Sequence, residues 1–253
     1  MKVDLHLHCS ERSSCSIASE QQHIESAIKY GLDAIVITDH NKLVPEDHLK
    51  ELNQKYSPLK IFGGIEVRTV PNGDDVLVIG IKDSILEEKE WTYEALYKYV
   101  KNHGGFIALC HPYRYKNTVD IDIATYVPDA IEIHSTNIGN CDEQLIKALA
   151  NRLGCKLIGN SDGHCHLHTG IYHNILKGNP NTEEELANVL LNEDIIIGRD
   201  EARINEFNKN VKERELLINQ MISEGKNAED YHKATGNWVG EFERVLMGKS
   251  YEI

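Results

Sequence analysis

The chain has 253 residues, a formal net charge of −13 and a hydrophobic content of 41%, which is ordinary for a globular protein that buries a core. Its negative charge disfavours nonspecific binding to nucleic acid or to anionic membranes. No apolar run approaches the roughly 20 residues of a membrane span, so we expect no membrane partner and a cytoplasmic protein.

Short apolar runs typical of strands alternate with helical patterns along residues 1–198. The expected strands cover 2–8, 33–39, 59–67, 75–81, 105–111, 129–135, 155–162 and 194–198. The helices expected between them lie at about 19–31, 44–55, 92–103, 142–153 and 183–193. This alternation predicts a parallel sheet, either open or closed into a barrel.

Residues 199–253 differ in character, because they are rich in charge and mostly helical by period. We expect a helical extension that breaks at Gly225 and packs on its own barrel or on a dimer mate; it could also cover the active site. Its two expected apolar stripes consist of Ile204, Phe207, Val211, Ile218 and Met221, and of Trp238, Phe242 and Leu246.

The ends of the expected strands carry an unusual number of histidines and acids. Functional residues of α/β barrels and open sheets collect at the C-terminal ends of the strands. His6 and His8 are two residues apart and therefore share one strand face. Later strand ends carry Asp39, His40, Glu66, His111, His134, Asp162 and His164.

Taken singly, each of these residues is more often structural, as a buried histidine or as an aspartate in a turn or helix cap. Taken together, they predict a metal site. Imidazole and carboxylate ligands suit zinc, manganese or iron better than magnesium or calcium. There are more candidate ligands than one ion can use, so we expect two to three divalent ions. Two such ions can share a bridging hydroxide and clamp an anionic transition state, as in phosphoester hydrolysis.

The motif series "DLHLH", "ITDH", "GIEV", "CHP", "EIH" and "SDGH", in this order, resembles the PHP (polymerase and histidinol phosphatase) family over roughly residues 1–198. The resemblance implies a distorted (βα)7 TIM-like barrel whose trinuclear metal centre hydrolyses phosphate esters. It places the first ion on His6, His8, Glu66 and Asp162. By the same resemblance, Glu66 would bridge to a second ion completed by His111 and His134, and His40 and His164 would hold the third ion.

The sequence departs from the family pattern at one ligand position of the third ion. The family usually has a histidine or aspartate five or six residues after the second histidine of the first motif, whereas this chain has Ser13 and Ser14, followed by Cys15. Cys15 could act as a thiolate ligand and favour zinc or iron. Alternatively, the third site is weak, completed by water or empty. Of the other cysteines, we expect Cys9, Cys110 and Cys165 to be reduced and to face the wall behind the histidines.

Several residues beside the expected ligands are candidates for the chemistry. Arg114 could clamp a phosphoryl group, since guanidinium matches phosphate geometry, or it could form a surface salt bridge. Asp39 could protonate the leaving group or orient a ligand histidine, and Asp4 is a weaker candidate of the same kind.

Further histidines lie after the last motif and in the expected helices. His166 or His168 could donate to a phosphate or act as a general acid, although a loop of solvated histidines explains them equally well. Histidines in helical patterns are expected at the surface; these are His23, His48, His103 and His232.

Four functions compete. The first is hydrolysis of a small phosphomonoester such as histidinol phosphate or a nucleotide, which makes a small phosphorylated molecule the expected partner. The second is a nuclease that acts on nucleic-acid ends, which the acidic charge disfavours. A metal amidohydrolase and a non-catalytic module that binds a partner through the helical extension complete the set.

Overall fold

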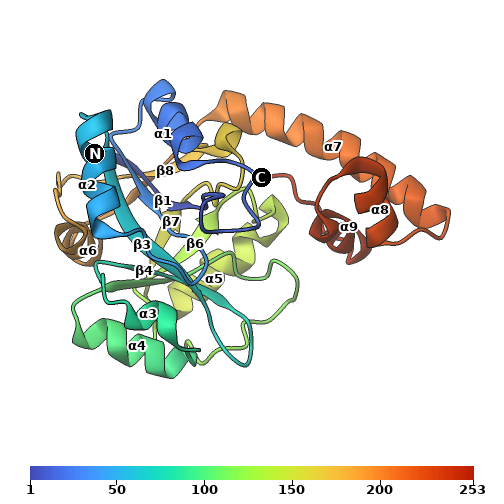
Figure 1. Cartoon of the computed structure of the whole chain (residues 1–253). Helices are drawn as coiled ribbons and strands as arrows, with labels where there is room; N and C mark the ends of the chain where they lie inside the picture. Colours follow the sequence, from blue (N-terminus) through green and yellow to red (C-terminus); the bar gives the residue numbers. More distant parts are fainter.

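Nine strands form one sheet that curls until it is nearly closed, in the order β7-β6-β5-β4-β3-β2-β1-β8-β9 (Figure 1). The computed structural model describes residues 1–253. Asn174 of β8 closes the seam, because its side chain accepts a hydrogen bond from Gly159 N (3.1 Å) and donates one to Gly159 O (2.8 Å). The strands are β1 (Lys2–Leu7), β2 (Ala34–Ile37), β3 (Lys60–Arg68), β4 (Asp75–Ile79), β5 (Phe106–Leu109), β6 (Ala130–His134), β7 (Lys156–Gly159), β8 (Tyr172–Ile175) and β9 (Ile196–Arg199).

The sheet is a distorted TIM-like barrel, which confirms the predicted fold class. Strands β1, β2 and β3 pair in parallel, as do β5, β6 and β7. The expectation of a wholly parallel sheet is wrong for β4, β8 and β9, which pair antiparallel with their neighbours. The link from β3 to β4 is too short for the crossover that parallel strands need. The short strand β8 was not expected, because "YHNI" carries little strand signal.

Helices cover the outside of the sheet (Figure 1). The first of them, α1, begins at a capping box in which the Ser19 and Gln22 side chains each bond the other residue's backbone N–H. The covering helices are α1 (Glu20–Lys29), α2 (Glu46–Tyr56), α3 (Ile85–Glu88), α4 (Tyr93–Asn102), α5 (Glu143–Leu153) and α6 (Glu183–Asn192), with short 3-10 turns at Asn140–Asp142 and His166–His168.

The last three helices form a helical extension with a small core of its own. Figure 1 shows the long α7 (Glu201–Ser223) leaving the barrel, with α8 (Ala228–Thr235) and α9 (Val239–Leu246) folded against its far part. The predicted break is confirmed, since α7 ends just before Gly225, which has a φ of +74°. This core consists of Val211, Ile218, Met221, Tyr231, Phe242 and Tyr251.

Two details of the extension differ from the expected stripes. Ile204 packs with Ile171 and Tyr172 beside β8 and not with the extension's core. The predicted stripe of α9 is wrong, because Trp238 and Leu246 are 43% and 63% exposed and the helix begins only after Trp238. None of the helices has both the length and the apolar character of a membrane span.

Candidate metal centre

Side chains from three distant segments meet around the Glu66 carboxylate. Glu66 Oε1 lies 3.1 Å from His111 Nε2 and 3.4 Å from His6 Nε2. Glu66 Oε2 lies 2.9 Å from His40 Nδ1 and 3.2 Å from His8 Nε2. The carboxylate thus faces four imidazoles, as a bridging ligand between ions would.

Asp162 is the second carboxylate of this group and joins it from the loop after β7. Its Oδ1 lies 3.4 Å from His6 Nε2 and 3.3 Å from His8 Nε2. The two histidine nitrogens are themselves 3.0 Å apart. His6, His8 and Asp162 are fully or almost fully buried, so each offers a ligand atom in a place that water does not screen.

The two carboxylates stay ionised despite burial. Burial alone would raise the pKa of Glu66, but nearby imidazoles, His6 and His40 foremost, bring this pKa well below its ordinary value. The pKa of Asp162 is likewise lowered against the effect of burial, by His6 and His8. Glu66 and Cys15 in turn raise the pKa of His40 to about 11, although burial opposes this. The group therefore attracts positive charge, which protons or a divalent cation can supply.

Unpaired buried atoms show that the donor set fits a cation. Asp162 Oδ1, Glu66 Oε2 and His8 Nδ1 are buried without a hydrogen-bond partner, and the two oxygens lie beside imidazole nitrogens without the alignment of a hydrogen bond. His111 and Asp162 also have positive φ angles of 24° and 47°. Such conformations are costly for non-glycine residues and cluster at functional sites.

Cys15 lies in a second group on the open side of the centre. One ligand atom from each of His8, Cys15, His40 and His164 lies within 4.8 Å of all the others. Ser13 is unsuited to replace Cys15, because its hydroxyl is buried, donates to Asp39 Oδ1 and accepts from His40 N. The geometry therefore brings Cys15, and not Ser13, beside His8, His40 and His164.

The structure does not bring His134 into the cluster. Its ring stacks on Tyr172 at 5.0 Å, and the charged groups acting on it are Glu143, Arg199 and Lys147 on the outer side of the sheet. The pairing of β6 with β7 shifts between Glu132 and His134, so the two residues no longer share a face. The predicted ligand role of His134 is not supported by this placement.

Glu132 takes the inward position on β6 that sequence reasoning gave to His134. Its Oε1 lies 3.1 Å from His6 Nδ1 and accepts a hydrogen bond from Asn160 Nδ2 (2.8 Å), and its Oε2 accepts one from His111 N (3.1 Å). A carboxylate on Nδ1 leaves Nε2 of His6 to face the other carboxylates, as is common for metal-bound histidine. The signal was in the sequence as the glutamate of "EIH".

The two aspartates considered for acid catalysis are fully engaged elsewhere. Asp39 accepts hydrogen bonds from Cys9 N (2.6 Å), Arg12 Nε (2.7 Å) and Ser13 Oγ (2.8 Å). Asp4 accepts hydrogen bonds from the Ser161 hydroxyl and from Gly170 N, and burial raises its pKa to about 6. Asp39 therefore orients the loop that carries the serines, and Asp4 links β1 to the segment after β7.

Arg114 lies beside the centre, whereas His166 and His168 do not join it. Arg114 Nη2 donates to Asn137 Oδ1 (2.7 Å), and Asn137 Nδ2 donates to Asp162 Oδ2 (2.7 Å). His168 packs edge-on against Phe207 of α7 at 5.2 Å, and burial lowers its pKa to about 4. The His166 side chain is half-buried and makes no hydrogen bond.

The surface assignment of His23 is wrong. This ring is fully buried under β1, 2.8 Å from Thr169 Oγ1 and 2.9 Å from His8 O. Burial lowers its pKa to about 4. The neutral ring therefore supports the backbone of His8 from behind. All six cysteines are free, and Cys9 and Cys110 are buried. The expectation that Cys110 faces away from the histidines is wrong, because its sulfur lies within 4.8 Å of ligand atoms of His6 and Glu66.

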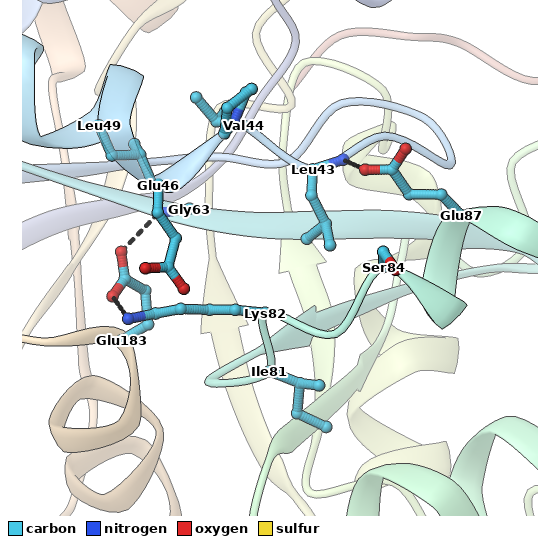
Figure 2. Close-up of a pocket in the computed structure, with 11 residues that line it drawn as sticks. Leu43, Val44, Glu46, Leu49, Gly63, Ile81, Lys82, Ser84, Glu87 and Glu183 are labelled. Atoms are coloured by element: carbon cyan, nitrogen blue, oxygen red, sulfur yellow. Dashed lines mark hydrogen bonds and ion pairs between the residues drawn. The ribbon is translucent and has the colours of Figure 1, made fainter.

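A pocket on the outside of the barrel is separate from this centre. Figure 2 shows it between the segment before α2, β3 and the link after β4. Its polar groups satisfy one another: Glu183 accepts from Gly63 N (3.2 Å) and pairs with Lys82 (3.0 Å), and Glu87 accepts from Leu43 N (2.8 Å). It shares no residue with the centre, so we interpret it as a joint between elements.

A family model described as "PHP domain" matches residues 4–251 of the chain. The match therefore runs beyond residue 198 and through the helical extension. Among curated proteins, the DNA polymerase III PolC-type of Clostridium perfringens is 28% identical over 87 residues, which are 34% of this chain. The matched region spans only 6% of that polymerase.

Solved structures share the fold at low sequence identity. PsfC from Pseudomonas syringae is 20% identical with a TM-score of 0.59, over 80% of this chain and 92% of that one. A "putative metal-dependent phosphoesterase" from Bifidobacterium adolescentis is 13% identical with a TM-score of 0.56, over 76% and 96%. An amidohydrolase from Chromobacterium violaceum with bound sulfate and no metal is 13% identical with a TM-score of 0.54, over 65% and 88%.

Proposed function

The chain belongs to the PHP family, and from this premise we propose that it is a metal-dependent phosphoesterase that hydrolyses a small phosphomonoester. The observation that carries the proposal is the convergence on Glu66 of four imidazoles, with a second buried carboxylate, Asp162, beside it. Two anionic groups that remain ionised in a buried site fit divalent cations.

The ligands divide into three overlapping groups around Glu66. His6, His8, Asp162 and Glu66 would hold one ion, and Glu66 with His111 would hold a second. Asp75 of β4, whose Oδ2 lies 3.9 Å from His111 Nε2, is a neighbouring carboxylate on that side.

A third ion would lie among His8, Cys15, His40 and His164. The thiolate favours zinc or iron there, and the nitrogen and carboxylate ligands of the other sites accept manganese as well.

Bound ions of this kind lower the pKa of coordinated water and neutralise a phosphoryl group. The chain supplies the positioning. Glu132 fixes the orientation of the His6 ring, and Asn137 links Arg114 to Asp162. Arg114 makes no salt bridge, so its guanidinium can bind a phosphoryl oxygen next to the cluster.

Hydrolysis at nucleic-acid ends is a second candidate, and the short similarity to the PolC-type polymerase favours it. The net charge of −13 disfavours a polymer with many phosphates. A small phosphorylated molecule fits the charge better, because only one phosphate has to be neutralised.

A substrate panel separates these candidates. The protein, stripped of metal and reloaded with Mn²⁺ or Zn²⁺, is assayed on 4-nitrophenyl phosphate, nucleotides, sugar phosphates, histidinol phosphate and short oligonucleotides. We expect phosphate release from small monoesters that EDTA stops, with Glu66→Gln as the control for contaminating phosphatases. Activity on oligonucleotides alone would favour the nuclease, and no activity on any phosphoester would contradict the proposal.

A further inference from the structure

The Arg114 guanidinium is held without any carboxylate partner. One of its amino groups bonds Asn137 Oδ1 at 2.7 Å, and its Nε is buried with no partner. Asn137 is itself fixed by Asp162, so the guanidinium has a defined position relative to the metal centre.

An aromatic pair holds the flat face of this guanidinium, and one of the two rings comes from the helical extension. The Arg114 guanidinium carbon lies 4.5 Å from the centroid of the Trp238 ring and 5.0 Å from that of Tyr115. The two rings meet edge to face at 5.7 Å. Trp238 directly precedes α9, so a residue of the helical extension contacts the guanidinium of Arg114 at the mouth of the barrel.

The extension is built to place this indole. A Cβ on Gly240 would lie only 2.5 Å from Trp238 Cη2, so the ring folds back over a position where any larger residue would displace it. The helix that follows is anchored by Phe242, which is buried in the extension's core. Tyr231 of α8 donates a hydrogen bond to Glu241 of α9 at 2.7 Å.

Two further cationic side chains of the extension contact the same part of the barrel. Arg244, only 2% exposed, donates from Nη1 to the backbone oxygen of Asn137 at 3.4 Å. Lys249 donates to the backbone oxygen of Tyr113 at 2.8 Å and pairs with Asp142 at 3.0 Å. Tyr113 has a φ of 66° in the loop that carries Arg114. The extension thus fixes both the loop and the asparagine that position Arg114.

We propose that the helical extension is part of the active site, in which Trp238 is a positioning residue that presents Arg114 to the phosphoryl group of the substrate. This inference rests on the proposed phosphoesterase function. It gives the extension a defined role: it sets affinity for phosphate through a cation–π contact and a tethered loop.

The test compares Trp238→Ala, Trp238→Phe and Arg114→Ala with Leu246→Ala, a control at the C-terminal end of α9 whose side chain is 63% exposed. The measured quantities are kcat, KM for 4-nitrophenyl phosphate and the inhibition constant of inorganic phosphate, with Tm and bound metal as checks. We expect Trp238→Ala to raise KM and the inhibition constant about 3- to 10-fold. Trp238→Phe should restore most of the loss, and Leu246→Ala should change nothing.

The double variant shows whether Trp238 acts through Arg114. If it does, Trp238→Ala adds no further loss when Arg114 is already alanine. Parental KM and phosphate inhibition in Trp238→Ala, or an equal loss in both backgrounds, would overturn the proposal.

Fluorescence separates this proposal from the phosphoesterase proposal. The chain has two tryptophans, and Trp91 is buried and 2% exposed. In metal-free protein, Arg114→Ala should change the emission of the parent but not of the Trp238→Phe variant. If no phosphoester is hydrolysed while this signal is present, the proposed function fails and the contact stands. If the parent is active and the signal is absent, the positioning role fails alone.

Discussion

Two strands end in a similar three-residue pattern, "HLH" at β1, where His8 directly follows the strand, and "EIH" in β6, and they place it differently. In β1 both His6 and His8 reach the metal centre, with their Nε2 atoms 3.0 Å apart. In β6 only Glu132 points inward, and His134 lies on the far side against Tyr172. The same spacing therefore gives two residues that face the centre in one strand and only one in the other.

The difference comes from what holds the end of each strand. Gly163 N donates to His6 O (3.1 Å) and His8 N donates to Gly163 O (3.0 Å), so β1 stays extended through His8 although its pairing with β2 shifts between Asp4 and Leu7. In β6 the shift falls between Glu132 and His134. Residues two apart share a face only where the strand is regular, and a bulge reverses the later one.

The largest expected effect comes from Glu66 of β3, the carboxylate that both His6 and His8 face. Glu66→Gln keeps the volume but removes the charge that faces His6, His8, His40 and His111. We expect kcat/KM to fall by roughly 10²- to 10³-fold or more, as when a group that stabilises developing charge is lost. Bound metal per chain should also fall, with the far-ultraviolet circular dichroism retained. Parental activity and metal content would contradict the bridging role.

A matched pair of substitutions sharpens the comparison on β6. Glu132→Gln should weaken metal affinity about 10- to 100-fold, because the carboxylate that orients His6 is lost. His134→Gln, two residues later, should leave metal affinity within about 2-fold of the parent, since this ring faces away from the centre. Competition titration with a chromophoric chelator measures both. The reverse order of effects would restore His134 as a ligand and remove Glu132 from its positioning role.

A smaller effect is expected from Cys15, which belongs to the second group of candidate ligands that contains His8. Cys15→Ser should lose about one ion per chain under zinc loading and leave the others bound, because only the group with His8, His40 and His164 contains this thiol. Elemental analysis after dialysis counts the ions. Ser14→Ala, an exposed neighbour, is the control. An unchanged count would show that the thiol holds no metal.

The smallest effect concerns His23, which supports the His8 backbone. Its folded pKa of about 4 lies below the ordinary 6.5, so between these values the unfolded chain binds a proton that the folded chain does not. The contribution of neutral His23 to the free energy of unfolding is fully present above about pH 6.5. It is lost as the pH drops toward 4, by at most roughly 3 kcal/mol.

The comparison of parent and His23→Gln isolates the effect of His23 protonation on stability, because glutamine can still donate to His8 O but does not titrate. Tm measured at pH 7 and pH 5 should fall more in the parent than in His23→Gln. Equal losses in the two proteins would mean that His23 does not couple folding to pH.

Much of the fold and the centre follows from the sequence for a clear reason. Parallel strands bring their C-terminal ends to one rim, so "HLH", "GIEV" and "SDGH" predict neighbours without any long-range information. Glu132 and not His134 faces the centre because of a bulge in β6. The sequence of a five-residue strand gives no sign of such a bulge. His23 was misjudged because polarity does not reveal which face of α1 is buried. The contact of Trp238 with Arg114 joins segments far apart in sequence, and no local pattern encodes it.

The most direct test of the account is an anomalous difference map from crystals soaked in MnCl₂. We predict at least one peak bonded to Glu66 together with His6, His8 and Asp162, and no peak within bonding distance of His134. Strong manganese peaks elsewhere with none at Glu66, or a peak bonded to His134, would contradict the arrangement described here.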